Sequence, residues 1–253
     1  MSRPADLFDV QDRVACVTGA SAGLGRAIAT ALAQAGAHVV GVARRAEALD
    51  DWRRSVGGRT AALAADVADP ETMAEVAADA AAPFGAPDIL VAAAGINTRQ
   101  SADDVTAEGW RRTLDLNLAA PFFLAQAMVP AMKAKGWGRI VTFASLQSFR
   151  AFPAGLAYGA SKGGIAQLTR AMAEAWSPHG ITANALAPGF FPTELTGPVF
   201  ADPERAARNA AQTCMGRNGT LDDIVGPALF LCSDASGYVT GQILAVDGGF
   251  TAK

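Results

Sequence analysis

Short apolar segments alternate along the chain with longer segments of helical spacing. The short segments cover residues 14–18, 38–43, 61–65, 88–92, 139–144, 181–186 and 243–246. Each is apolar on both faces, which is typical of a parallel strand that helices cover from both sides. The longer segments, at residues 24–35, 46–54, 70–82, 119–135 and 158–176, carry apolar residues at helical spacing. This alternation predicts an α/β fold with a doubly wound, seven-stranded parallel sheet and helices on both faces.

Nothing in the sequence divides the chain into two domains. Its 253 residues suffice for one large α/β domain, and no stretch rich in Pro, Ser or charge separates two halves. We therefore predict a single domain over residues 1–253. Residues 190–219 differ from the rest, because prolines interrupt a patchy helical pattern there. We predict that this segment, called the lid below, is a mobile lid over a binding site.

Composition and charge narrow the class of protein. A net charge of −3 gives no electrostatic footprint for nucleic acid. The N-terminus lacks the apolar core of a signal peptide, and no segment reaches the roughly 18 uninterrupted apolar residues of a membrane span. We predict a cytoplasmic protein that contacts neither membrane nor nucleic acid. Cys16, Cys214 and Cys232 have no metal-binding or redox spacing, so we expect reduced packing residues and no metal.

A glycine-rich turn follows the first predicted strand. The sequence TGASAGLG, residues 18–25, places three glycines between that strand and the next helix. In an open α/β sheet this turn lies at the carboxyl ends of the strands, where ligands bind. Glycines permit close approach of the backbone, and the free N–H groups of a helix N-terminus attract phosphate. We predict a dinucleotide pyrophosphate site, with a merely flexible loop as the alternative; its residues are Gly19, Ser21, Gly23, Leu24 and Gly25.

The end of the second strand should meet the adenosine half of the dinucleotide. An acidic residue there holds the ribose hydroxyls of NAD, whereas arginine accommodates the extra phosphate of NADP. Arg44 and Arg45 occupy this position, and unpaired cations are unfavourable at a helix N-terminus. We therefore expect NADP(H) to be preferred and NAD(H) to be possible; a solvated arginine pair is the alternative. Asp66 and Val67 follow the third strand and are predicted to contact the adenine, unless Asp66 is an ordinary turn residue.

Tyr158 and Lys162, in the sequence YGASK, lie four residues apart and so share one face of a helix. A phenol titrates at about pH 10, and a neighbouring ammonium stabilises its anion, which suits proton transfer to and from a carbonyl oxygen. Ser145 follows the strand at residues 139–144, at the same edge as the glycine turn, and can orient that oxygen. A surface Tyr–Lys pair and a capping serine are the alternatives.

Taken together, these segments resemble the short-chain dehydrogenase/reductase family over essentially the whole chain. The resemblance is carried by TGASAGLG, DILVAAAG, LDLNLAAPF, FAS, YGASK, ALAPGF and VDGG. It implies a Rossmann fold and an NAD(P)-dependent oxidoreductase that transfers a hydride between nicotinamide and a secondary alcohol or ketone. It implies that Tyr158 exchanges the proton, Lys162 lowers its pKa and holds the nicotinamide ribose, and Ser145 positions the substrate oxygen. Asn117 is implied to hold a relay water, and the residues implied to border the cofactor are Ala94, Gly95, Pro188, Gly189, Phe191 and Thr193.

One segment departs from the pattern of the family. Members usually carry Asn-Asn-Ala-Gly after the fourth strand, whereas residues 92–95 read Ala-Ala-Ala-Gly. The missing amides remove hydrogen bonds between neighbouring strands but no proton-transfer group. This departure puts local rigidity and cofactor affinity in question, not catalysis.

Parts of the sequence are similar to the sugar-acid members of the family, the gluconate 5-dehydrogenases and the 2-dehydro-3-deoxy-D-gluconate 5-dehydrogenases. The similar segments are AAGINTRQSA, ASLQSF, APGFFPTELT and VDGGFTAK. A sugar-acid pocket needs a cation for the carboxylate and polar groups for the hydroxyls. Our hypothesis is that Arg99 holds the carboxylate, with Gln147 and Arg150 also facing the substrate; an exposed loop arginine is the alternative for Arg99. Phe190 and Phe191 favour a more apolar ketone, so a 3-oxoacyl or general small-ketone reductase is the second interpretation.

Two other functional classes fit the sequence less well. A non-catalytic nucleotide sensor has no need of the proton-transfer residues that are present here. A hydrolase could use Ser145 as its nucleophile, but no G-x-S-x-G elbow surrounds it, and His38 and His179 are too scattered for a triad or a metal site. The long apolar helices predict a homo-oligomer, and the resemblance implies a homotetramer in which these helices and the C-terminal segment pair.

Overall fold

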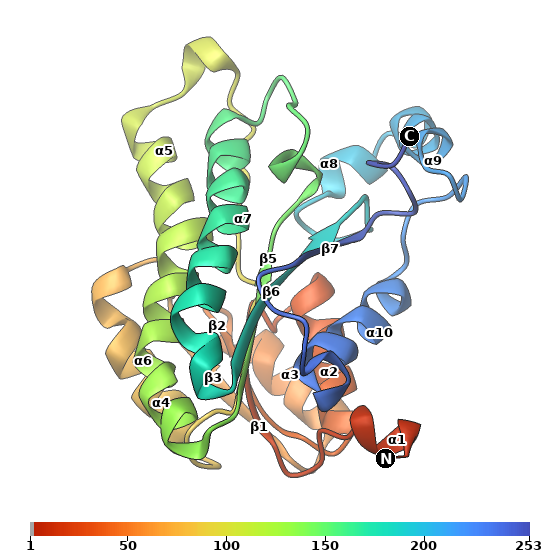
Figure 1. Ribbon diagram of the computed structural model, residues 1–253. Helices are drawn as coiled ribbons and strands as arrows, with labels where there is room; N and C mark the ends of the chain where they lie inside the picture. The colour runs from red at the N-terminus through yellow and green to blue at the C-terminus, as the bar shows by residue number, and fades with distance from the viewer. Residues whose placement is uncertain (1–2) are drawn as a thin grey trace.

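Seven parallel strands form one sheet at the centre of the protein, in the order β3-β2-β1-β4-β5-β6-β7 (Figure 1). The computed structural model describes residues 3–253. The winding direction reverses between the neighbouring strands β1 and β4, and in such sheets ligands bind between the carboxyl ends of those two strands. The predicted doubly wound Rossmann fold is confirmed. The strands are β1 (Val14–Thr18), β2 (His38–Ala43), β3 (Thr60–Ala64), β4 (Ile89–Ala92), β5 (Gly138–Phe143), β6 (Ile181–Pro188) and β7 (Ile243–Val246).

Helices cover both faces of the sheet and bury two large apolar clusters against it (Figure 1). Apolar residues that recur on one side of each helix make this packing favourable. One face carries α2 (Gly23–Gln34), α3 (Ala46–Val56) and α10 (Leu221–Cys232). The other carries α4 (Met73–Ala81), α6 (Ala120–Lys135) and α7 (Leu156–Trp176). The remaining helices are α1 (Pro4–Leu7), α5 (Ala107–Leu114), α8 (Gly197–Phe200) and α9 (Pro203–Gln212).

The two edge strands differ from the sequence prediction. All seven strands are predicted to be covered on both faces, but β3 and β7 are each partly exposed. An edge strand has a neighbour on one side only, and the helices of the two faces do not extend fully over it. Apolar composition alone therefore does not separate a central strand from an edge strand.

The predicted helix at residues 119–135 is the second half of a longer helix. α5, a π-helical turn at Asp115–Ala119 and α6 form one continuous helix, Ala107–Lys135. By length and composition alone this helix could cross a membrane. Here it packs against α4 and α7, as a core helix of a layered α/β protein does.

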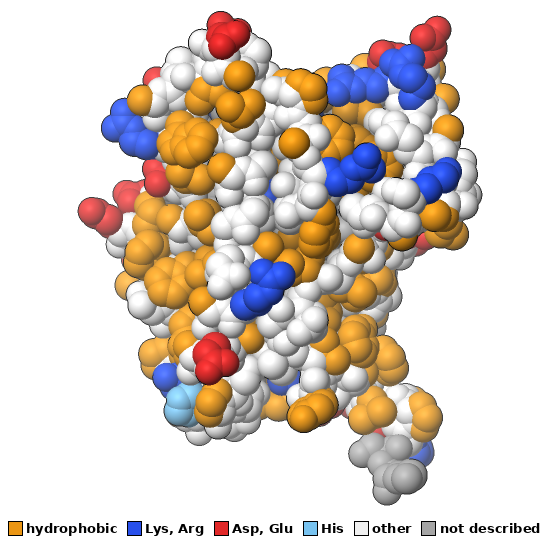
Figure 2. All heavy atoms as spheres, turned by 45° about the horizontal axis from the view of Figure 1, so that its top comes forward, with side chains coloured by type: hydrophobic (Ala, Val, Ile, Leu, Met, Phe, Trp, Pro, Cys, Tyr) orange, Lys and Arg blue, Asp and Glu red, His pale blue; other side chains and the backbone are white. Residues whose placement is uncertain are grey.

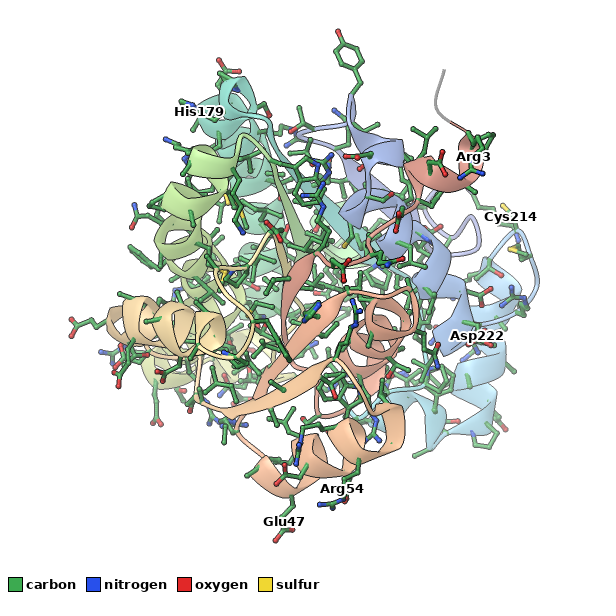
Figure 3. The ribbon with its side chains drawn as sticks, turned by 90° about the horizontal axis from the view of Figure 1, so that it is seen from below. Arg3, Glu47, Arg54, His179, Cys214 and Asp222 are labelled. Atoms are coloured by element: carbon green, nitrogen blue, oxygen red, sulfur yellow. The ribbon has the colours of Figure 1, made fainter. Side chains whose placement is uncertain are left out.

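The lid, residues 190–219, contains α8 and α9 and lies at the top of Figure 1. It also carries Cys214, which is exposed and lies at the periphery of Figure 3, so the packing interpretation is wrong for this cysteine. Cys16 and Cys232 are buried in the apolar clusters, as predicted. All three thiols are free.

Candidate active site

In the turn between β1 and α2, backbone segments of the same turn lie very close to each other. Gly19 has a φ of +71°, a conformation that side chains rarely adopt. A Cβ atom on Gly25 would lie 2.5 Å from the Gly19 carbonyl oxygen. Ala22, the N-cap residue of α2, provides no side-chain cap, so the first N–H groups of the helix are left for an anion. We call this turn, residues 18–25, the cradle.

Thr18 links the cradle to the turn after β4. Its hydroxyl accepts a hydrogen bond from the backbone N–H of Ala94 at 3.1 Å. This bond joins the ends of β1 and β4 at the position where the usual family amides are missing. Next to it, a Cβ atom on Gly95 would lie 3.2 Å from the Asn117 side-chain oxygen and 3.9 Å from the Lys162 ammonium. The turn after β4 thus lies directly against the predicted proton-transfer residues.

Asn117 is buried in the π-helical turn and fixes the loop after β4. Its side-chain oxygen accepts from the Ile96 N–H at 2.9 Å, and its amide donates to the Ile96 carbonyl at 2.9 Å. The amide also donates to the Ser161 hydroxyl at 3.1 Å, and this hydroxyl donates to the Tyr158 carbonyl at 2.7 Å. Both amide N–H groups of Asn117 are therefore used within the protein, and its side-chain oxygen accepts one hydrogen bond.

Ser145 caps a short 3-10 turn directly after β5. Its hydroxyl accepts from the Gln147 N–H at 3.2 Å, and its own N–H donates to the Ser148 hydroxyl at 3.2 Å. Ser148 in turn donates to the carbonyl of Lys162 at 2.7 Å, which holds this turn against α7. The Ser145 hydroxyl also lowers the pKa of the Tyr158 phenol, which places the two side chains near each other. Ser145 thus caps the turn and faces the tyrosine.

Tyr158 and Lys162 face the same edge of the sheet, and their pKa values shift in opposite directions. Burial raises the pKa of Tyr158, while the Ser145 hydrogen bond and the charge of Arg99 lower it. Burial lowers the pKa of Lys162 to about 8. The Lys162 ammonium lies 5.5 Å from the centre of the tyrosine ring and donates to the Phe143 carbonyl at 2.7 Å. In this arrangement Ser145 and Arg99 are the groups that favour the phenolate.

The two arginines after β2 each form an ion pair with a carboxylate of the protein. The expectation that they lack an anionic partner is therefore wrong. Arg44 lies 3.9 Å from the Asp66 carboxylate, and Arg45 lies 2.9 Å from the Glu194 carboxylate in the lid. Asp66 also accepts the Ala68 N–H at 3.0 Å, the role of an ordinary turn aspartate. The Val67 side chain is buried near the crevice between β1 and β4.

The residues after β6 approach the cradle from the opposite side. The Gly189 N–H donates to the Val246 carbonyl at 2.9 Å, which fixes the end of β6 at Pro188 beside β7. Thr193 reaches the cradle, because its methyl group lies 3.2 Å from where a Cβ of Gly23 would be. The Phe191 ring instead packs in the core against Gly219, so only its backbone is left to border a cofactor.

The three predicted substrate residues differ in their surroundings. Arg99 is partly buried, has a φ of +52° and donates to the Leu195 carbonyl in the lid. Gln147 packs against the start of α7 beside Gly155 and Gly159. Arg150 is exposed, with its guanidinium 5.2 Å from the Phe250 ring centre. Figure 2 shows basic side chains on this side of the molecule next to apolar ones.

Several residues of the site were missed in the sequence analysis. Ser161 was detectable because it lies inside the YGASK motif, whereas Ser148 and Glu194 act through contacts with residues distant in sequence.

The structure gives no support to the hydrolase alternative. His38 begins β2 and His179 precedes β6, so both lie at the amino ends of strands, and His179 is at the periphery of Figure 3.

The cradle fits a dinucleotide, and the adjacent side chains fit proton transfer. Gly25 lets the turn close tightly against the Gly19 carbonyl, the first N–H groups of α2 carry no side-chain cap, and Lys162 and Tyr158 lie beside the turn after β4. A nucleotide cradle next to a phenol that can exchange a proton defines a dinucleotide-dependent oxidoreductase.

Comparison with known proteins identifies the family. Residues 19–251 match the family profile described as Enoyl-(Acyl carrier protein) reductase. The chain is 39% identical to gluconate 5-dehydrogenase of Gluconobacter oxydans, with 100% of both chains covered. The chain therefore belongs to the short-chain dehydrogenase/reductase family, and it is an NAD(P)-dependent oxidoreductase.

Solved structures agree with this assignment. One similar structure is a candidate NAD(P)-dependent gluconate 5-dehydrogenase of Beutenbergia cavernae with bound NADP. Its TM-score to this chain is 0.92 and its identity is 46%, over 98% of this chain and 100% of that one. A gluconate 5-dehydrogenase of Burkholderia cenocepacia in complex with NADP and tartrate has a TM-score of 0.93 and 36% identity, covering 99% of this chain and 100% of that one.

Proposed function

We propose that this protein interconverts a secondary alcohol and a ketone on a sugar acid or polyol, as a gluconate 5-dehydrogenase-like enzyme. It prefers NADP(H), and NAD(H) is possible. The observation that carries the proposal is the convergence of the Tyr158 phenol with the Ser145 hydroxyl and the Arg99 guanidinium beside the cradle. The gluconate 5-dehydrogenases among its relatives, one of them with NADP and tartrate bound, support an acidic substrate.

The chemistry of the site follows from its side chains. When bound, the nicotinamide donates or accepts the hydride at the substrate carbon. Tyr158 donates its proton to the carbonyl oxygen in reduction and removes the hydroxyl proton in oxidation, while Ser145 hydrogen-bonds the same oxygen. Lys162, whose ammonium lies 5.5 Å from the tyrosine ring centre, adds to the stabilisation of the phenolate by Ser145 and Arg99 and holds the nicotinamide ribose. Asn117, in the π-helical turn, holds the relay water.

Arg99 is the residue that selects an acidic substrate. Its charge lowers the pKa of Tyr158, which places the two side chains on the same side of the site. No carboxylate among residues 3–253 forms an ion pair with it. A partly buried cation without an acidic partner is suited to bind a substrate carboxylate. Gln147 and Arg150 flank the pocket, and the lid closes over it.

Steady-state kinetics on a panel of sugar acids and matching neutral polyols test this function. We expect Arg99→Ala to raise KM for the acids about 10-fold or more and KM for the polyols less than about twofold, because one charge-assisted contact is lost. Arg112→Ala, an exposed arginine on α5, is the control and should change neither. Tyr158→Phe should abolish turnover and leave cofactor binding intact. Equal effects of Arg99→Ala on both substrate classes, or no wild-type turnover of either, contradict the proposal.

A second candidate function rests on the aromatic residues beside the pocket. The rings of Phe152 and Phe190 lie 6.5 Å apart, and those of Phe190 and Phe250 lie 5.7 Å apart. Such an apolar wall favours a 3-oxoacyl thioester or a small apolar ketone. An acetoacetyl thioester in the same panel separates the two functions, because an apolar pocket would turn it over faster than any sugar acid.

We further propose that the protein is soluble, acts in the cytoplasm and forms a homotetramer, without nucleic acid or membrane as partners. The net charge of −3 and the long helices α6 and α7 support this.

A further inference from the structure

The start of the lid is fastened to the rest of the site from two sides. On the substrate side, Arg99 donates a hydrogen bond to the Leu195 carbonyl. On the cofactor side, the Glu194 carboxylate accepts two hydrogen bonds from the Arg45 guanidinium, each at 2.9 Å. Between these two attachments, Thr193 lies against Gly23 of the cradle. The lid therefore begins directly above the turn that is to hold the pyrophosphate.

Glu194 occupies the anion-binding side of Arg45. The two parallel N–H···O bonds form the bidentate arrangement with which a guanidinium also grips phosphate. The same guanidinium donates to the Ser21 hydroxyl of the cradle at 3.1 Å. Arg45 follows β2, where proteins of this fold distinguish a ribose 2′-hydroxyl from a 2′-phosphate. The Arg45–Glu194 pair is therefore located where the two cofactors differ.

The Arg45–Glu194 pair is exposed enough for a bound phosphate to replace the Glu194 carboxylate. The side chains of Arg45 and Glu194 are 52% and 66% exposed, and exposed ion pairs contribute little to stability. A 2′-phosphate carries more negative charge than one carboxylate and can replace it on the guanidinium. If Glu194 stayed in place, its carboxylate would repel that phosphate. A 2′-hydroxyl carries no charge and leaves the pair undisturbed.

We propose that Glu194 is a specificity-determining residue: an internal anion that competes with the 2′-phosphate of NADP(H) for Arg45 and, when displaced, frees the start of the lid. NAD(H) binds without breaking the pair. This inference rests on the proposed function in one respect, that the arginines after β2 bind the adenosine ribose. The Arg44–Asp66 pair is a weaker competitor, because its closest atoms are 3.9 Å apart and Asp66 is also held by the Ala68 N–H.

Titration of the whole enzyme with NADPH and NADH, followed by cofactor fluorescence without substrate, tests the inference. Glu194→Gln should lower Kd for NADPH about three- to tenfold and leave Kd for NADH within about twofold, because only the phosphate competes with the carboxylate. In an Arg45→Ala background, the same substitution should no longer affect NADPH. Glu204→Gln is the matched control: it removes the same charge from the lid, on α9, where Glu204 pairs with Arg208 at 3.5 Å.

Hydrogen exchange without cofactor provides a second readout. Backbone amides at residues 193–202 should exchange faster in Glu194→Gln than in wild type, and at the wild-type rate in Glu204→Gln. An unchanged or raised Kd for NADPH in Glu194→Gln overturns the inference while the proposed function stands. A wild-type protein that binds NADH but not NADPH overturns the cofactor preference, and it overturns this inference as well if Glu194→Gln gains no NADPH binding.

Discussion

At the scale of single residues, burial sets the protonation of the two groups that carry the proposed chemistry. It raises the pKa of Tyr158 and lowers that of Lys162 to about 8, because removal from water disfavours both charged forms. Ser145 and Arg99 oppose the shift at the tyrosine. Tyr158 is therefore protonated at neutral pH, which is the form that donates a proton to a carbonyl oxygen. The phenolate needed for oxidation depends on the cations around it.

Lys162 should make the free energy of unfolding depend on pH. Its pKa is about 8 in the folded protein against an ordinary value of 10.5, so between these values the unfolded chain binds the extra proton and stability rises with pH. Relative to Lys162→Met, wild type should gain about 1 kcal/mol between pH 8 and pH 9. The raised pKa values of Cys16 and Cys232 act in the opposite direction but cancel in this comparison. Denaturant unfolding at pH 7, 8 and 9 measures the difference, and a difference independent of pH would contradict it.

At the scale of elements, apolar patterning predicted the sheet better than the helices. The seven predicted strands agree with the structure within two residues at each end. α5 and α9 were not predicted, because both are short and rich in polar and charged residues, and they bury one residue and none respectively. α10 was missed as well, although Ile224, Ala228 and Leu231 recur at helical spacing, because it contains an interior proline, Pro227.

The candidate site, like the secondary structure, could be predicted from the sequence only in part. Parallel strands all end at one edge of the sheet, so Ser145, Tyr158 and the cradle could be placed together from the sequence. Glu194 could not, because its partner Arg45 lies 149 residues away along the chain. The pairing of Arg44 with Asp66 was missed as well, since no local pattern predicts an ion pair between the residues after β2 and those after β3.

Gly25 provides a test of the cradle as an element. An alanine there would place its Cβ atom 2.5 Å from a backbone oxygen that no side-chain rotation can move. We expect Gly25→Ala to weaken NADPH binding at least about tenfold and to lower the free energy of unfolding by about 1–3 kcal/mol, since the turn must distort. Gly226→Ala, in α10, meets nothing within 4 Å and is the control; it should bind normally and be slightly more stable. Normal NADPH binding by Gly25→Ala would show that the cradle does not hold the cofactor.

At the scale of the whole molecule, an apolar surface extends along the edge of the sheet. Leu244 in β7 is 36% exposed, and Phe149, after β5, is 51% exposed. Phe149 and Ile243, the residue before Leu244, help to line a surface hollow of about 660 Å³ between α7 and β7. An apolar edge strand next to a hollow is unfavourable in water and open to pairing with another chain. We propose that in the homotetramer a second copy of this chain covers β7.

If the chains associate through β7, a single charge introduced into this strand should disrupt the assembly. We expect light scattering to give about four times the 25.9 kDa mass of one chain for wild type, and a smaller species for Leu244→Asp, because a buried unpaired carboxylate opposes association. Leu7→Asp is the matched control: Leu7 is 37% exposed, almost the same as Leu244, but lies on α1, away from β7 in Figure 1, so this variant should keep the wild-type mass. Circular dichroism separates loss of assembly from loss of fold. A folded Leu244→Asp variant with the wild-type mass would exclude β7 from the interface, and a monomeric wild type would remove the assembly altogether.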